Sequence, residues 1–351
     1  MTHDRNQPLP ARRILIVKLY GIGNALLALP AIRAVRNAYP QAVFGIICDE
    51  RNEALMRATG FFSTYTVLPS RHRVTTYGTV YRAMKSFAPD MIISSYPLFH
   101  YGVALLYRLS SAATIVGDAC HTPRWCYTHR TRVPDTAHEK ERNDALLAVL
   151  GVPGDAGELF YPLTEKDEEA ATQVWQAQTA EGKAVVGFHC GSSAALPEKR
   201  WPADYFAQVA QKLLKQGDIT IMLFGGADDE EVSRAVAERV GQPVVSCVNR
   251  YPIGTVAALM KRCRVFVAND SGLMHTAAAV RTPLVALFGP TAVTKNAPVG
   301  DAARIRLCAA TVPCVPCHLP GRRMYCTRQA GCMETITVDA VVRAVRSLMK
   351  G

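Results

Sequence analysis

The sequence predicts an α/β protein built from two Rossmann-like, doubly wound domains that face a central cleft. Apolar runs of strand length alternate with amphipathic helical patterns in two successive series, which is typical of parallel sheets covered by helices. A stretch that bears glycine and proline, residues 151–162, separates the two series. The chain of 351 residues is long for one core but suits two domains of about 150 to 200 residues.

The first series opens with a βαβ pattern: an apolar strand at residues 13–18, a glycine turn at 20–24, a helix at 25–38 and a second strand at 42–48. Its other expected strands lie near residues 64–68, 91–94 and 114–116, and its other helices near 79–87, 101–109 and 143–150. Residues 1–163 are therefore predicted to form the N-terminal domain.

The second series begins with a helix at residues 165–179. Its expected strands are 184–189, 220–224, 244–246, 265–268 and 284–288, and its helices are 203–215, 230–240, 253–261 and 274–280. We predict a C-terminal domain over residues 164–337, with a cysteine-bearing loop at 308–333, followed by a last helix within 338–351.

The composition restricts the class of protein. Hydrophobic residues make up 49% of the chain and charged residues 20%, which excludes a disordered protein. No apolar run approaches the ~20 residues of a membrane-spanning helix. The first ten residues lack the apolar segment of a secretion signal, so we expect a cytoplasmic protein.

The charge is unevenly distributed. The formal net charge is +11, and residues 1–150 carry 18 Lys/Arg against 10 Asp/Glu. This surface is either a solvated basic face or a surface that attracts anionic partners. The chain has no zinc finger, RNA-binding signature or dense Lys/Arg tract, so we expect no nucleic-acid partner. The pattern favours an anionic acceptor molecule, or contact with an anionic membrane at its cytoplasmic face. An aromatic and basic run at residues 125–132 is either an acceptor loop or a solvated surface loop.

Several strand ends of the second series carry residues suited to phosphate. A polar turn that contains Gly191, Ser192 and Ser193 follows the strand at 184–189, and its backbone amides could cradle a phosphate. Lys199 and Arg200 come just before a helix, where cations and the helix dipole would meet a pyrophosphate, although such residues are often only solvated. After the strand at 220–224, the paired glycines Gly225 and Gly226 allow close approach of a ligand.

The most informative segment is residues 265–275. A buried strand ends at Asp270, and a helix begins with Ser271, Gly272 and, in its first turn, His275. The amides of Ser271 and Gly272 would point at an anion, and Asp270 either holds sugar hydroxyls or acts as an ordinary helix cap. The next strand delivers Gly289 and Thr291 to the same sheet edge, where open α/β sheets bind ligands.

Three motifs together resemble a known family. Residues 199–202 (KRWP), 269–275 (NDSGLMH) and 288–291 (FGPT) are similar to motifs of the heptosyltransferases of glycosyltransferase family 9, and residues 14–18 and 29–32 resemble its first strand and helix. The resemblance spans nearly the whole chain. It implies a GT-B fold and metal-independent, inverting transfer from a nucleotide sugar, typically ADP-L-glycero-β-D-manno-heptose, to the inner core of lipopolysaccharide. It also implies that Lys199 contacts donor phosphate, that Asp270 contacts the sugar, and that Ser271, Gly272 and His275 contact the phosphate end.

One position departs from the family pattern. After Gly21 and Gly23, where the family usually has an aspartate near the acceptor hydroxyl as general base, this chain has Asn24. An amide cannot take up a proton at neutral pH, and general-base catalysis is worth about 10²–10⁴-fold. An asparagine here could position the acceptor but could not act as its base.

Three interpretations of Asn24 follow. Another residue supplies the base, or the acceptor needs little help, or the chain is a weak transferase or a nucleotide-sugar-binding relative. The candidates for a replacement base are Asp49, Glu50, Asp118 and His121, of which Asp118 and His121 are also candidate acceptor contacts.

Four cysteines near the C-terminus have the spacing of a metal site. Cys314, Cys317, Cys326 and Cys332 could supply four thiolates to a structural Zn or Fe ion, with arginines at 322, 323 and 328 nearby. The alternative is free thiols or a local disulfide. Such a metal would brace the loop, and no cofactor is expected for the transfer itself.

The acceptor is left open by the sequence. A protein hydroxyl, another surface polysaccharide or a small natural product are alternatives to lipopolysaccharide. A nucleotide-sugar epimerase of similar architecture is a further alternative, which the segment at 269–275 disfavours.

Overall fold

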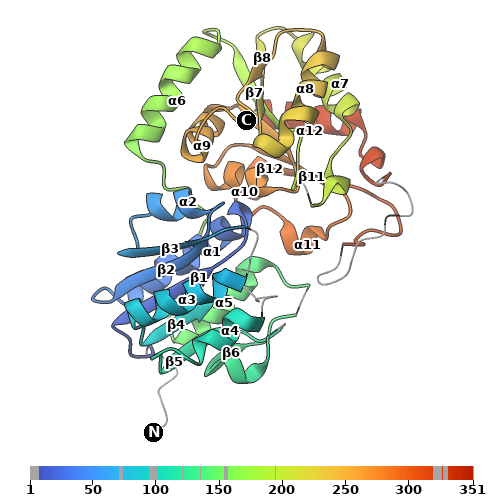
Figure 1. The fold of residues 1–351 in the computed structure, drawn as a ribbon. Coiled ribbons are helices and arrows are strands. Elements are labelled where there is room, and N and C mark those ends of the chain that lie inside the picture. The colour runs from blue at the N-terminus through green and yellow to red at the C-terminus, as the bar shows by residue number, and fades with distance from the viewer. Residues whose placement is uncertain are drawn as a thin grey trace. The chain divides into compact units, whose positions relative to one another are not determined.

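A computed structural model describes residues 8–70, 74–94, 101–120, 122–134, 136–153, 157–193, 195–318, 326 and 331–350. The chain divides into two compact units, residues 1–158 and 159–351. Each unit contains one six-stranded sheet (Figure 1), and every strand pair recorded in the two sheets is parallel. The boundary expected after residue 163 falls close to this division.

The sheet of the first unit has the strand order β3-β2-β1-β4-β5-β6. Its central strand β1 has five buried residues of six, because helices cover both faces of a parallel sheet. The strands are β1 Arg13–Lys18, β2 Val43–Asp49, β3 Thr64–Leu68, β4 Met91–Ser94, β5 Thr114–Asp118 and β6 His129–Thr131. The helices are α1 Ile22–Ala38, α2 Glu53–Ala58, α3 Val74–Phe87, α4 Tyr101–Tyr107 and α5 Glu139–Leu150, with a short 3-10 helix, η1, at Arg124–Cys126.

The turn between β1 and α1 differs from the expectation. Helix α1 begins at Ile22 rather than at residue 25, so that Asn24 lies in its first turn. Tyr20 just before it has φ of 77°, a left-handed conformation that is unfavourable for a bulky side chain. The amide of Asn52, which is fully buried, donates to the Tyr20 carbonyl oxygen at 2.7 Å and holds this turn in place.

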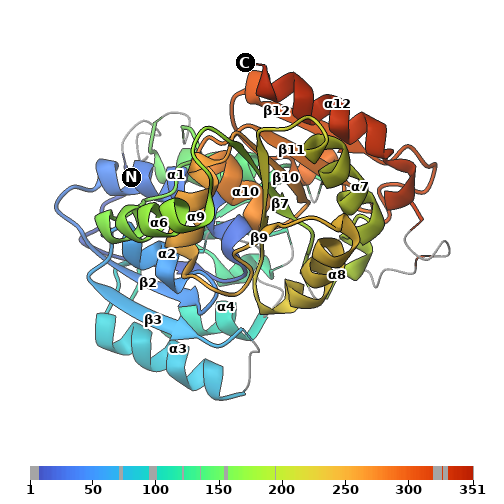
Figure 2. The ribbon, with the colours of Figure 1, turned by 90° about the horizontal axis from the view of Figure 1, so that it is seen from above.

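The sheet of the second unit has the order β12-β11-β10-β7-β8-β9. Helices α7, α8 and α12 lie together on one face, and α6, α9 and α10 lie on the other (Figure 2). The strands are β7 Ala184–His189, β8 Ile219–Phe224, β9 Val245–Ser246, β10 Val265–Asn269, β11 Leu284–Phe288 and β12 Ile305–Ala309. The helices are α6 Glu165–Gln178, α7 Ala203–Leu214, α8 Glu230–Val240, α9 Ile253–Arg262, α10 Gly272–Ala279, α11 Val293–Asn296 and α12 Val338–Met349.

Two strands, β6 and β12, were not predicted. Both lie at sheet edges and are only partly buried, so neither has the continuous apolar run by which the other strands are recognised. The last helix, α12, packs against α7, and its buried residues Val341, Val345 and Leu348 belong to the hydrophobic core of the second unit.

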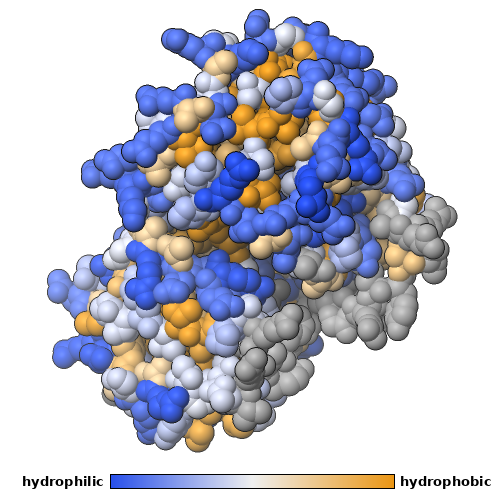
Figure 3. Space-filling view, turned by 45° about the horizontal axis from the view of Figure 1, so that its top comes forward, coloured by the Kyte–Doolittle hydropathy of each residue, from blue (hydrophilic) through white to orange (hydrophobic). Residues whose placement is uncertain are grey.

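The surface shown in Figure 3 is mostly hydrophilic, with smaller apolar areas between charged side chains. None of the helices in the described parts of the chain is long and apolar enough to cross a membrane.

Candidate functional site

The candidate site lies at the carboxyl edge of the second sheet. Strands β7, β10 and β11 end at His189, Asn269 and Phe288, and they are neighbours in the order β11-β10-β7. Most of the predicted phosphate-binding and sugar-binding residues lie in the loops that follow these three strands. The topology therefore brings them to one edge, as open α/β sheets generally do with ligand sites.

Asp270 is the centre of this edge. Its side chain is 5% exposed, and its Oδ2 accepts hydrogen bonds from Lys199 Nζ at 2.8 Å, Thr291 Oγ1 at 2.6 Å and Asn296 Nδ2 at 3.3 Å. Among the residues that the structure describes, no donor is recorded for the other oxygen, Oδ1. Asp270 thus joins the loops after β7, β10 and β11 through Oδ2 alone.

The charge of Asp270 is stabilised by its neighbours. Burial alone would raise the pKa of this carboxyl group, but the Lys199 ammonium, its hydrogen bond and that of Thr291 outweigh burial and hold the pKa below its usual value. Asp270 is therefore a carboxylate at neutral pH, which accepts hydrogen bonds and does not donate them.

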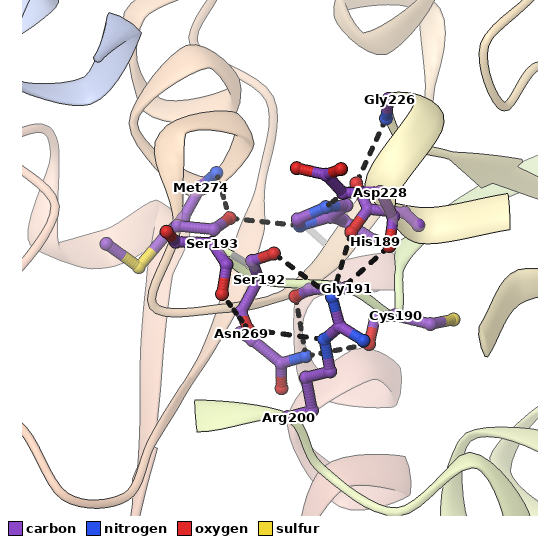
Figure 4. Close-up of polar contacts among 12 residues, drawn as sticks. His189, Cys190, Gly191, Ser192, Ser193, Arg200, Gly226, Asp228, Asn269 and Met274 are labelled. Atoms are coloured by element: carbon purple, nitrogen blue, oxygen red, sulfur yellow. Dashed lines mark hydrogen bonds and ion pairs between the residues drawn. The ribbon is translucent and has the colours of Figure 1, made fainter. Parts of the chain in front are cut away.

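Asn269, the residue before Asp270, holds the loop after β7 in place. It is fully buried, and its Nδ2 donates to the carbonyl oxygens of Cys190 at 3.0 Å and Gly191 at 2.9 Å (Figure 4). Its Oδ1 accepts the backbone N–H of Trp201 at 3.1 Å. Asn269 therefore ties the end of β10 to both sides of the loop that carries Lys199.

Arg200 braces the same loop. Its guanidinium donates to Ser192 Oγ at 3.4 Å, to the Ser192 carbonyl oxygen at 3.4 Å and to the Asp228 carbonyl oxygen at 3.3 Å (Figure 4). Ser192 is buried and its hydroxyl donates to the Leu196 carbonyl oxygen, whereas Ser193 is exposed. The predicted phosphate contacts of Arg200 and Ser192 compete with these internal bonds.

The glycines at this edge make room for side chains of the protein itself. A Cβ on Gly225 would lie 2.7 Å from Asp229 Cβ, and one on Gly289 would lie 2.2 Å from Met333 Sδ. The sequence predicts close approach of a ligand at Gly225 and places Gly289 at the same sheet edge. Packing against Asp229 and Met333 already requires that these two residues have no side chain. Gly226 donates its N–H to Asp229 Oδ2 at 3.0 Å.

His189 and Asp229 also lie at this edge, and the sequence analysis selected neither as a site residue. His189 contacts Ser271 Oγ through Nδ1 at 2.9 Å and Asp229 Oδ2 through Nε2 at 3.2 Å. Ser271 is the N-cap of α10, His275 is buried in the first turn of that helix, and Gly272 is its first residue. The sequence signal for His189 was weak, because a histidine at the end of an apolar strand is not by itself distinctive.

The first unit holds the predicted acceptor residues. Gly21 is the N-cap of α1, and Gly23 and Asn24 lie in its first turn. Among the described residues, no hydrogen bond is recorded for the Asn24 side chain. His121 lies outside the described residues.

The three described candidates for a replacement base are already engaged. Both carboxylate oxygens of Asp49 accept from Arg51 at 2.8 Å. Asp118 is 1% exposed and forms a buried ion pair with Arg142, so it serves the interior of the first unit. Glu50 accepts the Ser70 backbone N–H at 2.9 Å, and the Ser70 side chain, followed by this backbone bond, lowers the pKa of Glu50. A carboxylate with a lowered pKa is a weaker base.

Comparison with known proteins identifies the family. The family model for glycosyltransferase family 9 (heptosyltransferase) matches residues 80–326. The chain belongs to this family.

A curated relative is also similar in sequence. Lipooligosaccharide heptosyltransferase 2 of Haemophilus influenzae is 36% identical over 152 residues, which are 41% of this chain and 43% of that protein. The chain thus spans less than half the length of this curated relative.

Solved structures show the fold. A family 9 glycosyltransferase from Veillonella parvula has a TM-score of 0.81 at 22% identity and covers 99% of both chains. The iron-containing, dodecameric heptosyltransferase TibC of Escherichia coli H10407, solved with ADP-D-β-D-heptose, has a TM-score of 0.61 at 14% identity over 98% of this chain and 78% of that chain. The likeness confirms the predicted GT-B fold of this family 9 protein.

The described residues of this family 9 chain give no support for the predicted metal site in the cysteine loop. Burial first, and then the neighbouring thiols, raise the pKa values of Cys317 and Cys332, each of which lies in electrostatic range of the other cysteines of the loop. Among the described residues, which include all four cysteines, no group of three or more His, Cys, Asp or Glu side chains is placed to hold a metal ion. Among the described residues, no disulfide is recorded for Cys314, Cys317, Cys326 or Cys332.

The Lys199–Asp270 pair predicts a specific pH dependence of stability. Asp270→Asn should lower the free energy of unfolding at pH 7 by roughly 3 kcal/mol, because one partner of a buried pair is removed. The pKa of Asp270 is lower in the folded state than its usual 3.8, so its stabilisation is fully present above that value and is lost as the pH falls through the folded-state pKa. Urea unfolding of the wild type and the variant at pH 7 and pH 3 measures the difference, which should shrink at pH 3.

The control for this measurement is Asp339→Asn, which removes an exposed ion-pair partner of Lys212. It should change stability little at either pH. A difference between wild type and Asp270→Asn that stays constant from pH 7 to pH 3 would contradict the assignment of a charged Asp270.

Proposed function

We propose that this family 9 protein is an inverting glycosyltransferase that moves a heptose or a related sugar from ADP-heptose to an anionic acceptor such as the inner core of lipopolysaccharide. Family membership supports the reaction, the name of the Haemophilus influenzae relative supports the acceptor class, and the ADP-D-β-D-heptose bound to TibC supports the donor. The observation that carries the proposal is a buried carboxylate, Asp270, with one open oxygen beside the Lys199 ammonium.

The donor diphosphate would meet Lys199 and the start of α10. An ammonium group has three N–H donors, and Asp270 occupies one of those of Lys199, which leaves two for phosphate oxygens. The N–H groups of Gly272 and of the residue after it face the same edge and carry the positive end of the helix dipole. The open Oδ1 of Asp270 would accept a hydroxyl of the sugar, next to the diphosphate.

The reaction is a single displacement at the anomeric carbon. The acceptor oxygen forms a bond to this carbon on one side, the bond to the diphosphate oxygen breaks on the other, and ADP leaves with the bonding electrons and one additional negative charge. Lys199 and the α10 amides stabilise that charge as it develops, in a site where burial strengthens the interaction. Because Asp270 holds Lys199 in place beforehand, little reorganisation accompanies the reaction.

The acceptor must also lose a proton. Asp49 and Asp118 are bound to arginines and Glu50 is a weakened base, so none of these three is ready to accept it in this structure. Asn24 is left to orient the acceptor hydroxyl through its amide. A slow transferase, or a binding protein that lacks turnover, is the alternative that Asn24 favours.

The first test measures ADP release from ADP-heptose by the purified protein, with and without Kdo-lipid A as acceptor. Release should depend on the acceptor, and Asp270→Ala should lower kcat/KM by about 10²-fold or more, because the sugar contact and the support of Lys199 are both lost. Asp204→Ala, at an exposed ion pair with Arg239, is the matched control and should leave release unchanged. Equal release with and without acceptor sinks the transferase assignment, and tight ADP-heptose binding without turnover points to another acceptor or to a binding role.

Asn24→Asp tests the missing base in the same assay. It should raise kcat by about tenfold or more if proton removal limits the rate, since a positioned general base is worth about 10²–10⁴-fold. The increase should appear as the pH rises through the pKa of the new carboxyl group. Asn37→Asp, an exposed position near the end of the same helix, is the control. An unchanged or lower rate for Asn24→Asp means that the acceptor is activated in another way.

A membrane-facing surface is part of the proposal, because the acceptor of the relatives is a glycolipid. Leu105 of α4, Leu109 just beyond it and Trp125 of η1 are 46%, 54% and 59% exposed, and α4 contacts η1. Arg108 and Arg124 lie beside them, are exposed, and have no recorded acidic partner among the described residues. Apolar side chains flanked by arginines suit the headgroup region of an anionic bilayer. We call these five residues the α4–η1 surface.

Vesicle binding tests the α4–η1 surface. The protein should co-sediment with vesicles that contain anionic phospholipid more than with neutral ones, and Arg108→Ala with Arg124→Ala should weaken this binding about tenfold or more, at about 1 kcal/mol per arginine. Arg57→Ala with Arg239→Ala removes the same charge from paired surface positions and serves as control. If both double variants lost vesicle binding equally, net charge alone would explain the binding, and the assignment of the α4–η1 surface would be wrong.

A further inference from the structure

Ser271, His189 and Asp229 form a buried chain of hydrogen bonds beside the proposed donor site. His189 is 4% exposed and Asp229 is 7% exposed. The two nitrogens of the His189 imidazole contact Ser271 on one side and the Asp229 carboxylate on the other, at 2.9 and 3.2 Å. These residues are 82 and 40 positions apart from His189 in the sequence. They join the ends of β7 and β10 to the loop after β8.

The position of Asp229 is fixed from several directions. A Cβ on Gly191 would lie 1.7 Å from Asp229 Oδ1, and a Cβ on Gly225 would lie 2.7 Å from Asp229 Cβ. Gly226 donates its N–H to Oδ2 at 3.0 Å. Any side chain at residue 191 or 225 would displace the carboxylate. Gly191 and Gly225 therefore leave the space that the Asp229 side chain occupies. An acidic residue that only served the dipole of the following helix would need no such space.

The direction of each hydrogen bond follows from the charge of Asp229. Burial raises the pKa of this carboxyl group, but the hydrogen bond from His189, the Gly226 N–H and Arg200 outweigh burial and lower it. A carboxylate only accepts, so we assign the proton of His189 to Nε2. In the neutral imidazole Nδ1 then carries the lone pair and accepts the Ser271 hydroxyl. The Ser271 oxygen in turn accepts the Met274 N–H at 3.4 Å as the cap of α10.

We propose that Asp229 and His189 are positioning residues that hold the Ser271 hydroxyl in its capping orientation, so that the free N–H groups at the start of α10 stay directed at the donor diphosphate. This inference rests on the proposed function. The Ser271 hydroxyl is directed at His189, so Ser271 serves the phosphate through the helix that it caps. The consequence is that His189 affects donor binding only as long as residue 271 has a hydroxyl.

Two substitutions of His189 separate this role from a merely structural one. Glutamine places its amide near the position of Nε2, so it can still donate to Asp229 but leaves the Ser271 hydroxyl without an acceptor. Asparagine places its amide oxygen near the position of Nδ1, so it can still accept from Ser271 but no longer reaches Asp229. If the relay acts through Ser271, His189→Gln is the harmful variant and His189→Asn the tolerated one. If His189 only holds Asp229, the order is reversed.

The experiment measures the Kd of ADP by titration calorimetry at pH 8 with the full chain. His189→Gln and Ser271→Ala should each weaken ADP binding about five- to tenfold, as expected for one buried hydrogen bond, and His189→Asn and Ser271→Thr should stay within about twofold of wild type. The double variant His189→Gln with Ser271→Ala should bind no more weakly than Ser271→Ala alone. Cys263→Ala, buried near the opposite edge of the sheet, controls for lost stability and should leave the Kd unchanged. Thermal melting of each variant reports folding.

Two results would overturn the relay. Additive losses in the double variant, or a His189→Asn that binds more weakly than His189→Gln, would reduce His189 to a packing residue while ADP binding by the wild type upholds the donor assignment. Absence of ADP binding by a folded wild type would instead reject the proposed donor, and the relay with it. The Ser271 variants keep the test decisive if a His189 variant does not fold.

Discussion

The ion pair between Lys199 and Asp270 is the contact on which the donor side depends. A carboxylate that is 5% exposed must be compensated, and Asp270 receives an ammonium, a hydroxyl and an amide from loops that follow β7 and β11. The same contacts that keep Asp270 charged therefore hold three loops at one sheet edge. Since all three donors meet one oxygen, the other is left for a ligand. The hydrogen bonds that compensate the buried charge would therefore also shape the proposed sugar site.

The two sheet edges use their charges differently. In the second unit, Lys199 uses one of its three N–H donors for Asp270, and the start of α10 adds backbone N–H groups. In the first unit, Asp49 and Asp118 are each neutralised by an arginine close by. Lys199 and the start of α10 can bind an anion without breaking an internal bond. Asp49 or Asp118, in contrast, would have to separate from its arginine before it could accept a proton. The donor chemistry is therefore built into the structure more completely than the activation of the acceptor.

The sequence predicted the parts of this protein that depend on local pattern. The buried parallel strands have continuous apolar runs, and Asp270 follows one of them directly, so both were found. The edge strands β6 and β12 lack that run and were missed. The relay from Asp229 to Ser271 was also missed, because it joins residues that tertiary structure alone brings together. For the same reason, the sequence does not show that side chains of the protein itself fill the space beside Gly225 and Gly289.

The turn before Asn24 argues that this edge of the first unit has a use besides folding. Tyr20 has φ of 77°, which is strained for an aromatic residue and is of order 1–3 kcal/mol unfavourable. A buried asparagine, Asn52, donates to the carbonyl oxygen of this same residue and leaves its own Oδ1 without a recorded hydrogen-bond partner. A glycine at residue 20 would relieve the backbone strain. Tyr20 lies two residues before Ile22, where the helix that carries Asn24 begins, so the strained turn sets the start of that helix. An amide is better suited to orienting an acceptor hydroxyl than to removing its proton, so under the proposed function the proton must pass to another group.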